Sequence, residues 1–272
     1  IYWKPGRIWS SKKGVLKFLS RFANQSRIRI NRKTNSFDGV DAFNPFFARI
    51  SDTSLISTNS NLRNTLFFNR TSRIFGAEYT YQDIRNKTLL ASGFDSRFNQ
   101  FHEVAMRCNI KRKITFKLSV KIGEKISEVD YVTGRNYSID YFFIEPRIIY
   151  QPNTLLTVTL DGRISDKQNL MQLGGELAKI YEVGSTVKYN QVQKGSIQGG
   201  LKMLNIQYNG NSNSALGFEM LEGLSSGLNY TWNIGYQMSI SKNLQLSIQY
   251  NGRKSENIKI IHSGGMELRA FF

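Results

Sequence analysis

The residue types that carry acid–base or nucleophilic chemistry are scarce in this chain. Two His and one Cys occur among its 272 residues. His262, Ser263 and Glu267 form the one sequence-local grouping of the residue types that hydrolases use. Adjacent residues of a strand point to opposite faces, so His262 and Ser263 could not meet on a strand. We therefore predict that the chain is not an enzyme.

The same counts limit metal and cofactor binding. A structural zinc site takes about four Cys or His ligands, whereas two His and one Cys make three in the whole chain. Glycine pairs such as Gly174-Gly175 lack the context of a phosphate-binding loop. We predict no metal and no cofactor, and the single Cys108 excludes a disulfide within the chain.

The charge of the chain is strongly basic. Lys and Arg number 37 and Asp and Glu 20, which gives a formal charge of +17. A basic excess often indicates nucleic-acid binding, but these bases are spread over many segments and accompany no nucleic-acid-binding motif. We predict no nucleic-acid partner. The sequence also lacks the roughly 18 consecutive apolar residues that a membrane-spanning helix needs.

The dominant pattern is alternation of apolar and polar residues with a period of two, which predicts strands. Residues 227–240 show it most clearly, and this run exceeds the usual strand length of about 3–10 residues. Similar segments lie at 62–69, 103–110, 114–122, 156–165, 244–251 and 266–272, with further strands near 73–83, 136–150, 179–190 and 195–208. The phase changes near Met203-Leu204, which predicts a bulge. Residues 15–30 suit a strand through their even positions, although 15–22 also suit an amphipathic helix, and we favour the strand.

The connections between these segments alternate in length. Short turns are expected near 70–72, 151–154, 193–195 and 241–243, and longer polar loops at 31–60, 84–99, 124–135, 166–177, 209–226 and 252–260. This asymmetry is typical of hairpins that cross an outer membrane. A soluble β-sandwich also alternates, but its strands are shorter than these. We predict an all-β fold, a transmembrane antiparallel up-and-down β-barrel of about twelve strands with a polar and basic lumen.

The alternation assigns a face to each charged or aromatic side chain. The bases expected to line the lumen are Arg21, Arg29, Arg63, Arg107, Lys117, Lys121, Arg163 and Arg269. The aromatics expected to form girdles on the lipid side are Tyr150, Tyr189, Tyr230, Trp232, Tyr236 and Tyr250. A one-sign lining would attract anions, whereas bases cross-linked through carboxylates would close the lumen. A third interpretation places some bases at the rims, against lipopolysaccharide phosphates.

The closing segments GLNYTWNIGYQMSISKNLQLSIQYNGRKSE and IHSGGMELRAFF resemble the end of outer-membrane β-barrel proteins of the Bacteroidota. The terminal Phe272 is similar to the C-terminal signal that such barrels present to the barrel-assembly machinery. The resemblance implies a location in the bacterial outer membrane, contact with outer-membrane lipid and lipopolysaccharide, and assembly by that machinery. Some members look like C-terminal barrels of much longer chains. We expect residues 1–272 to form a single barrel domain, either alone or as the C-terminal part of a longer chain.

These observations lead to two functional hypotheses. The first is a non-enzymatic outer-membrane barrel that serves as an anchor or scaffold subunit of a larger cell-envelope assembly, with other envelope proteins as partners. The alternative is a porin-like channel for small anionic solutes, which the basic lumen favours.

Overall fold

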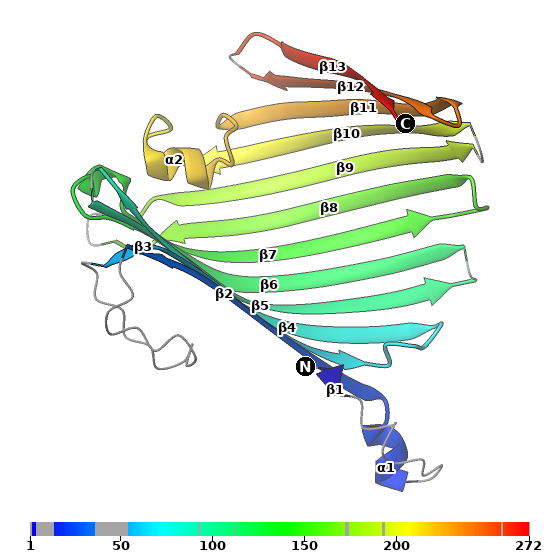
Figure 1. Ribbon diagram of the computed structural model, residues 1–272, viewed down its shortest axis with the longest axis horizontal. Helices are drawn as coiled ribbons and strands as arrows, with labels where there is room; N and C mark the ends of the chain where they lie inside the picture. The colour runs from blue at the N-terminus through cyan, green and yellow to red at the C-terminus, as the bar shows by residue number, and fades with distance from the viewer. Residues whose placement is uncertain are drawn as a thin grey trace.

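The alternating segments pair with their neighbours in chain order, as an up-and-down sheet (Figure 1). The computed structural model describes residues 2–3, 14–35, 54–91, 93–111, 113–171, 174–191, 194–256 and 258–271. Its strands are β1 (Tyr2–Trp3), β2 (Phe22–Thr34), β3 (Leu55–Phe68), β4 (Phe75–Leu90), β5 (Gly93–Ile110), β6 (Ile114–Val129), β7 (Tyr137–Tyr150), β8 (Leu156–Asn169), β9 (Leu177–Gln191), β10 (Gly195–Tyr208), β11 (Gly227–Ser241), β12 (Leu244–Ser255) and β13 (Ile261–Ala270). The helices are α1 (Gly14–Leu19), the 3₁₀ turn η2 (Thr133–Arg135) and α2 (Ala215–Met220).

The predicted fold class is confirmed. Within the described residues, β2 to β13 make twelve long antiparallel strands, and β1 adds two residues beside β2. The long strands run from 10 residues in β13 to 18 in β5, which reaches or exceeds the roughly 9–11 residues that a bilayer-crossing strand needs. No helix among the described residues is long and apolar enough to cross a membrane.

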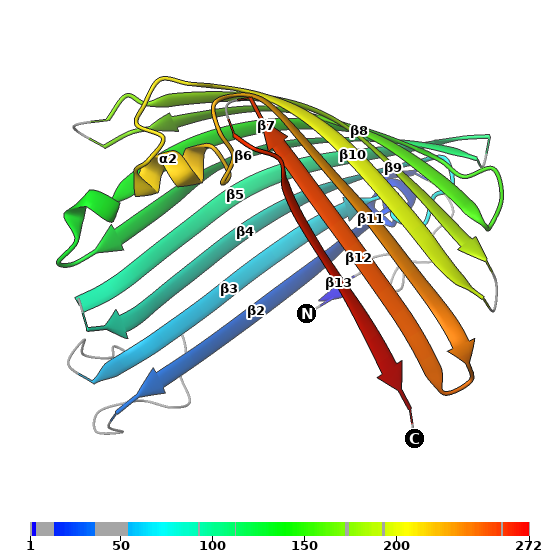
Figure 2. The same cartoon turned by 90° about the horizontal axis from the view of Figure 1, so that it is seen from above.

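The sheet curls, and its two faces differ in chemistry. Figure 2 shows α2 lying inside the curve, and its neighbour Leu221 packs on Ile180 and Ile206, which are register partners on β9 and β10. Register partners share a face, so the ladders extend this concave face from strand to strand. On the opposite, convex face every strand from β2 to β13 carries exposed large apolar side chains, from Ile28 at one edge to Met266 at the other.

Several connections are shorter than the sequence predicts. The loop expected at 84–99 is wrong, because β4 continues to Leu90 and β5 starts at Gly93. The loops expected at 124–135 and 166–177 are likewise shortened, since β6 runs to Val129 and β8 to Asn169. Beyond the apolar belt, both faces of the sheet can contact water. Polar residues can therefore continue the strands in these segments. The longest connection that the structure describes in full is 209–226, and it lies at the end of the sheet opposite the C-terminus.

The favoured strand over 15–30 is correct for its second half and wrong for its first. Residues 14–19 form α1, and β2 starts at Phe22. Phe18 and Phe22 pack on Phe68 at the start of the sheet, which joins the helix to β3 through aromatic contacts. Arg21 lies in the turn between α1 and β2, not on a strand.

The two edges of the sheet are separate in the described residues. β13 pairs with β12, and β2 pairs with β3 and, through Asn24 and Gln25, with β1. Between the described parts of β13 and those of β1 or β2 there is no ladder. Apart from Asn24 and Gln25, these two edges therefore have no ladder partner among the described strands.

Candidate binding site on the concave face

The concave face collects the predicted lumen bases. By register, Arg29, Arg63, Arg107, Lys117, Lys121, Arg163 and Arg269 all lie on this face. Arg21 is the exception, because it precedes β2. Some bases of this face form a row near the short turns, and others join a network of ion pairs around α2.

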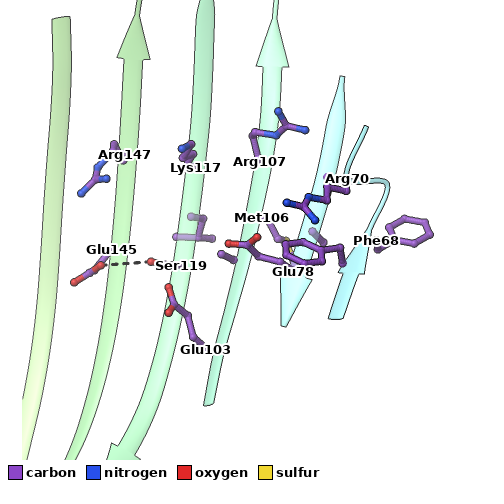
Figure 3. Close-up of a pocket in the computed structure, with 15 residues that line it drawn as sticks. Phe68, Arg70, Glu78, Glu103, Met106, Arg107, Lys117, Ser119, Glu145 and Arg147 are labelled. Carbon is purple, nitrogen blue, oxygen red and sulfur yellow. Dashed lines mark hydrogen bonds between the residues drawn. The ribbon is translucent and has the colours of Figure 1, made fainter. Parts of the chain in front are cut away.

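The row near the short turns consists of Arg107 on β5, Lys117 on β6 and Arg147 on β7, and we call it the basic row. Arg107 is the direct register partner of Lys117, and Lys117 is the partner of Arg147. Like charges placed directly opposite on adjacent strands repel. Figure 3 shows the three side chains in line, with the two guanidinium groups pointing away from Lys117. This arrangement is costly unless something of opposite charge compensates it.

Carboxylates do not supply that compensation at the basic row. Nη2 of Arg107 donates to the carbonyl of Ser72 at 2.9 Å, and a Cβ on Gly76 would lie 3.2 Å from the same nitrogen. Glycine at position 76 therefore leaves room for the guanidinium. Within the described residues, no carboxylate oxygen lies within 4.0 Å of the charged nitrogens of Arg107, Lys117 or Arg147, not even that of Asp161, the register partner of Arg147.

The next row of the ladder holds carboxylates that are directed elsewhere. Glu145 accepts from the Ser119 hydroxyl at 3.5 Å, and Glu103 lies 3.9 Å from Nζ of Lys121. The basic row and these carboxylates line one cavity of about 440 Å³ (Figure 3), with Glu78 and Arg70 at its far side. The site thus has a basic rim toward the short turns and an acidic rim deeper in the barrel wall.

The second zone is built by the connection between β10 and β11, which folds into the curve. Ser214 caps α2 by accepting from the amide of Gly217. The helix ends by burying Met220 and Leu221, at 0% and 1% exposure. Met220 packs on Ile139 and Ala178, and Leu221 on the apolar ends of β9 and β10.

Ion pairs hold this connection against the wall. Glu222 accepts from both terminal nitrogens of Arg163, at 3.0 and 2.6 Å, and from Lys167 at 2.8 Å. Glu219 pairs with Lys125 at 2.5 Å. We call Glu219, Glu222 and their three basic partners the α2 latch. It bridges β6 and β8 from inside the curve.

A second carboxylate extends the network along the wall. Glu182 on β9 pairs with Arg163 at 2.8 Å and with Lys202 at 2.6 Å. Burial opposes ionisation of Glu222, but hydrogen bonds from Arg163 and Lys167 and their positive charge outweigh it, so the pKa of this carboxyl is lowered. Glu222 is therefore charged at neutral pH.

The latch was missed by sequence reasoning. Lys167 falls in a segment expected to be a loop, and Glu219 and Glu222 lie in the connection 209–226. The bulge predicted near Met203-Leu204 is wrong, because β10 keeps unbroken register with β9 and β11. The apparent phase change arises because the concave face turns apolar under α2. The latch could have been predicted from an apolar residue pair inside a polar loop, combined with such a phase change in a neighbouring strand.

The predicted girdle residues lie on the convex face. Tyr150, Tyr189, Tyr230, Trp232, Tyr236 and Tyr250 are all placed there by register. His262 is also convex, and its Nδ1 lies 2.8 Å from the Tyr250 hydroxyl. Ser263 faces the other side of β13, opposite Asn251. Phe272 lies outside the described residues.

The charged side chains of the concave face are arranged so that they can bind charged groups. No group of three or more His, Cys, Asp or Glu side chains in the described part of the chain is placed to hold a metal ion. The absence of a cofactor stays a prediction. The concave face offers unpaired bases on one side and a closed ion-pair network on the other.

Comparisons with known proteins find similarity in shape alone. No family model matches the sequence, and no curated protein resembles it. The solved translocator domain of the autotransporter NalP from Neisseria meningitidis is 13% identical, with 79% of this chain and 80% of that chain covered and a TM-score of 0.38. LpxR from Salmonella typhimurium is 8% identical over 78% and 88%, with a TM-score of 0.34. The ferric yersiniabactin uptake receptor FyuA from Yersinia pestis is 9% identical over 91% and 53%, with a TM-score of 0.48. The fold assignment therefore rests on the sheet of this chain.

Proposed function

We propose that the chain is an integral outer-membrane β-barrel protein without enzymatic activity. The convex apolar belt is the observation that supports this proposal. Val183 and Met266 are 71% and 74% exposed, and every long strand carries at least one exposed large apolar side chain on its convex face. Soluble monomers rarely expose continuous apolar surface of this extent, whereas a barrel in lipid requires it.

The membrane proposal has a direct test. The chain is produced with a secretion signal in a Gram-negative host, and the washed outer membranes are analysed on denaturing gels with and without heating. We expect the protein in the outer-membrane fraction, with a faster band when unheated because a closed barrel resists detergent. Recovery in the soluble periplasmic fraction would contradict the proposal. The narrower assignment to the Bacteroidota rests on the resemblance of the closing strands.

Within that membrane, we propose that the barrel acts as an anchor or scaffold for a larger envelope assembly. The α2 latch supports this function, because it fills part of the interior and ties the connection 209–226 to β6 and β8. A cross-linked interior stiffens a barrel and narrows any passage through it.

A planar-bilayer experiment tests the filled interior. The wild-type barrel is compared with a variant in which residues 210–225 are replaced by a short Gly-Ser linker. We expect silent insertion of the wild type, confirmed by protease protection, and conductance steps from the variant. Stable conductance from the wild type would contradict a closed interior.

The second candidate is a channel for small anions, and the basic row favours it. If the wild type conducts, the basic row predicts anion preference, and replacing Arg107 and Lys117 with Glu should reverse it. Arg29→Glu is the matched control, since Arg29 lies on the same face at the far edge strand. Unchanged selectivity after the double replacement would eliminate this candidate.

A further inference from the structure

We infer that Arg107, Lys117 and Arg147 form a binding site for a phosphate-type oxyanion, as inorganic phosphate or as the phosphate of a small phosphorylated molecule. The inference rests on the proposed barrel, since the row lies on its inner face. It does not depend on whether the barrel conducts.

The first argument is the contrast between the basic row and the bases around α2. Lys125, Arg163, Lys167 and Lys202 each have a carboxylate oxygen within 3.0 Å. The three bases of the row have none within 4.0 Å among the described carboxylates. The bases around α2 are thus paired with carboxylates, whereas the three directly opposed bases of the basic row are not.

The second argument is geometric. Adjacent strands are about 4.8 Å apart, so the three Cα atoms of the basic row span two such steps. The two guanidinium groups point away from Lys117 (Figure 3), so a shared anion requires these long, flexible side chains to turn toward Lys117. Lys117 and Arg147 are exposed and Arg107 is half-buried, so the donors are accessible from the cavity. The hydrogen bond from Arg107 to Ser72 fixes one end of the row.

The third argument concerns the ligand class. A tetrahedral oxyanion with two charges neutralises more of the row than chloride and offers acceptors to all three side chains. The cavity of about 440 Å³ lies within the range of small-molecule sites, so it can also hold an organic group attached to the phosphate. Glu145 and Glu103, at the deeper rim, could accept hydrogen bonds from hydroxyls of such a group and would repel a second phosphate.

Calorimetric titration of the refolded barrel in zwitterionic detergent at low salt tests the site. Inorganic phosphate and glycerol 3-phosphate are titrated separately. We expect saturable binding of at least one, with Kd raised about tenfold or more by Lys117→Gln or Arg147→Gln, because each removes a charge-assisted hydrogen bond. Arg29→Gln, which removes the same charge from the same face, should change Kd by less than about twofold.

Comparing the two titrations identifies the ligand. Tighter binding of glycerol 3-phosphate, sensitive to the same variants, assigns the site to phosphorylated molecules, and equal binding assigns it to the phosphate group itself. Absence of saturable binding of both by a folded barrel overturns the inference, as does equal weakening by Arg29→Gln.

A stability measurement separates ligand binding from a structural role. Phosphate should raise the urea midpoint of the wild type and leave that of Lys117→Gln unchanged. Without phosphate, Lys117→Gln should be at least as stable as the wild type, because it relieves repulsion in the row. Loss of stability in this variant with an undiminished phosphate effect would overturn the site. The faster unheated gel band confirms each variant as folded, so failure of the site is distinguishable from failure of the barrel.

Discussion

At the residue scale, carboxylates on the concave face pair with bases that lie far from them in the sequence. Glu222 is the central example, since it neutralises Arg163 and Lys167, which lie 59 and 55 residues earlier. Removing one partner of a partly buried ion pair leaves the others uncompensated. The contribution of each carboxylate to stability should therefore depend on how deeply its basic partners are buried.

Glu222→Gln should destabilise the barrel by about 1–3 kcal/mol at pH 7, the range for a lost charge-assisted hydrogen bond with a buried partner. Reversible urea unfolding measures it. Glu219→Gln is the matched control on the same connection. Its pair with Lys125 is about one-third exposed, so we expect less than about 1 kcal/mol. Equal effects of the two variants would contradict this ranking.

The pH dependence of the same carboxyl follows from its lowered pKa. A carboxyl whose pKa is lowered by folding stabilises the folded state above its ordinary pKa of 4.5, and this contribution is lost as the pH falls through the lowered value. The stability gap between wild type and Glu222→Gln should therefore be constant from pH 7 to about 5 and shrink in more acid solution. A gap that grows on acidification would have the wrong sign.

The histidines of the convex face form a second residue-scale pattern. His102 and His262 each place Nδ1 within hydrogen-bond distance of a tyrosine hydroxyl on the preceding strand, Tyr79 at 2.7 Å and Tyr250 at 2.8 Å. A polar ring facing lipid needs such a partner. This pairing supports a structural role for His262.

At the element scale, α2 is a short helix that gains its stability from the wall. A helix of six residues is marginal by itself in water, so its placement depends on Met220, Leu221 and the latch. The wall provides Ile139, Ile180 and Ile206 at matching positions. The connection and the wall together form two clusters of buried apolar residues inside the curve.

Leu221→Ala should cost about 2–5 kcal/mol, the usual range for a fully buried leucine. Phe218→Ala is the matched control, because Phe218 lies on the same helix and is 68% exposed. We expect a change within about 0.5 kcal/mol for that variant. Urea midpoints of the refolded proteins decide between them, and a larger loss from Phe218→Ala would mean that α2 packs through its other side.

The elements that sequence reasoning misassigned share one physical cause. Alternation identifies strands where one face is apolar, and it weakens where both faces are polar. Residues 84–99 read as a loop for that reason, yet they extend the β4–β5 hairpin. At 15–22 the apolar positions fit two periods, and the contacts of Phe18 and Phe22 with Phe68 accompany the helical arrangement.

At the scale of the whole molecule, the open edges set a requirement. In hydrocarbon, unpaired backbone groups cost several kcal/mol each, so a membrane-spanning sheet must close. We expect β13 to pair with β2 beyond the short stretch that β1 covers. The described sheet is already curled in the direction that closure needs.

Disulfide cross-linking tests closure. In a Cys108→Ser background, Ser26→Cys on β2 is combined in turn with Cys at Gly264, Met266 or Leu268 on β13. All four side chains belong to the convex face, so we expect one combination to cross-link in membranes. Leu246→Cys with Leu268→Cys is the positive control, because these residues are register partners. Cross-linking of the control alone would show that β2 and β13 do not meet.

The sequence by itself determined most of the strands, their approximate number and the apolar character of the convex face. These properties are local, because side chains alternate between the two faces of a strand with a period of two. This alternation does not depend on which strand lies beside it. The tertiary structure decided which bases are paired, where α2 lies and how the edges meet. Lys125 and Glu219 are 94 residues apart in sequence, and no local pattern encodes their contact. Pairing of charges across a curved sheet depends on strand order, register and the path of one long connection together, so it exists only after the chain has folded.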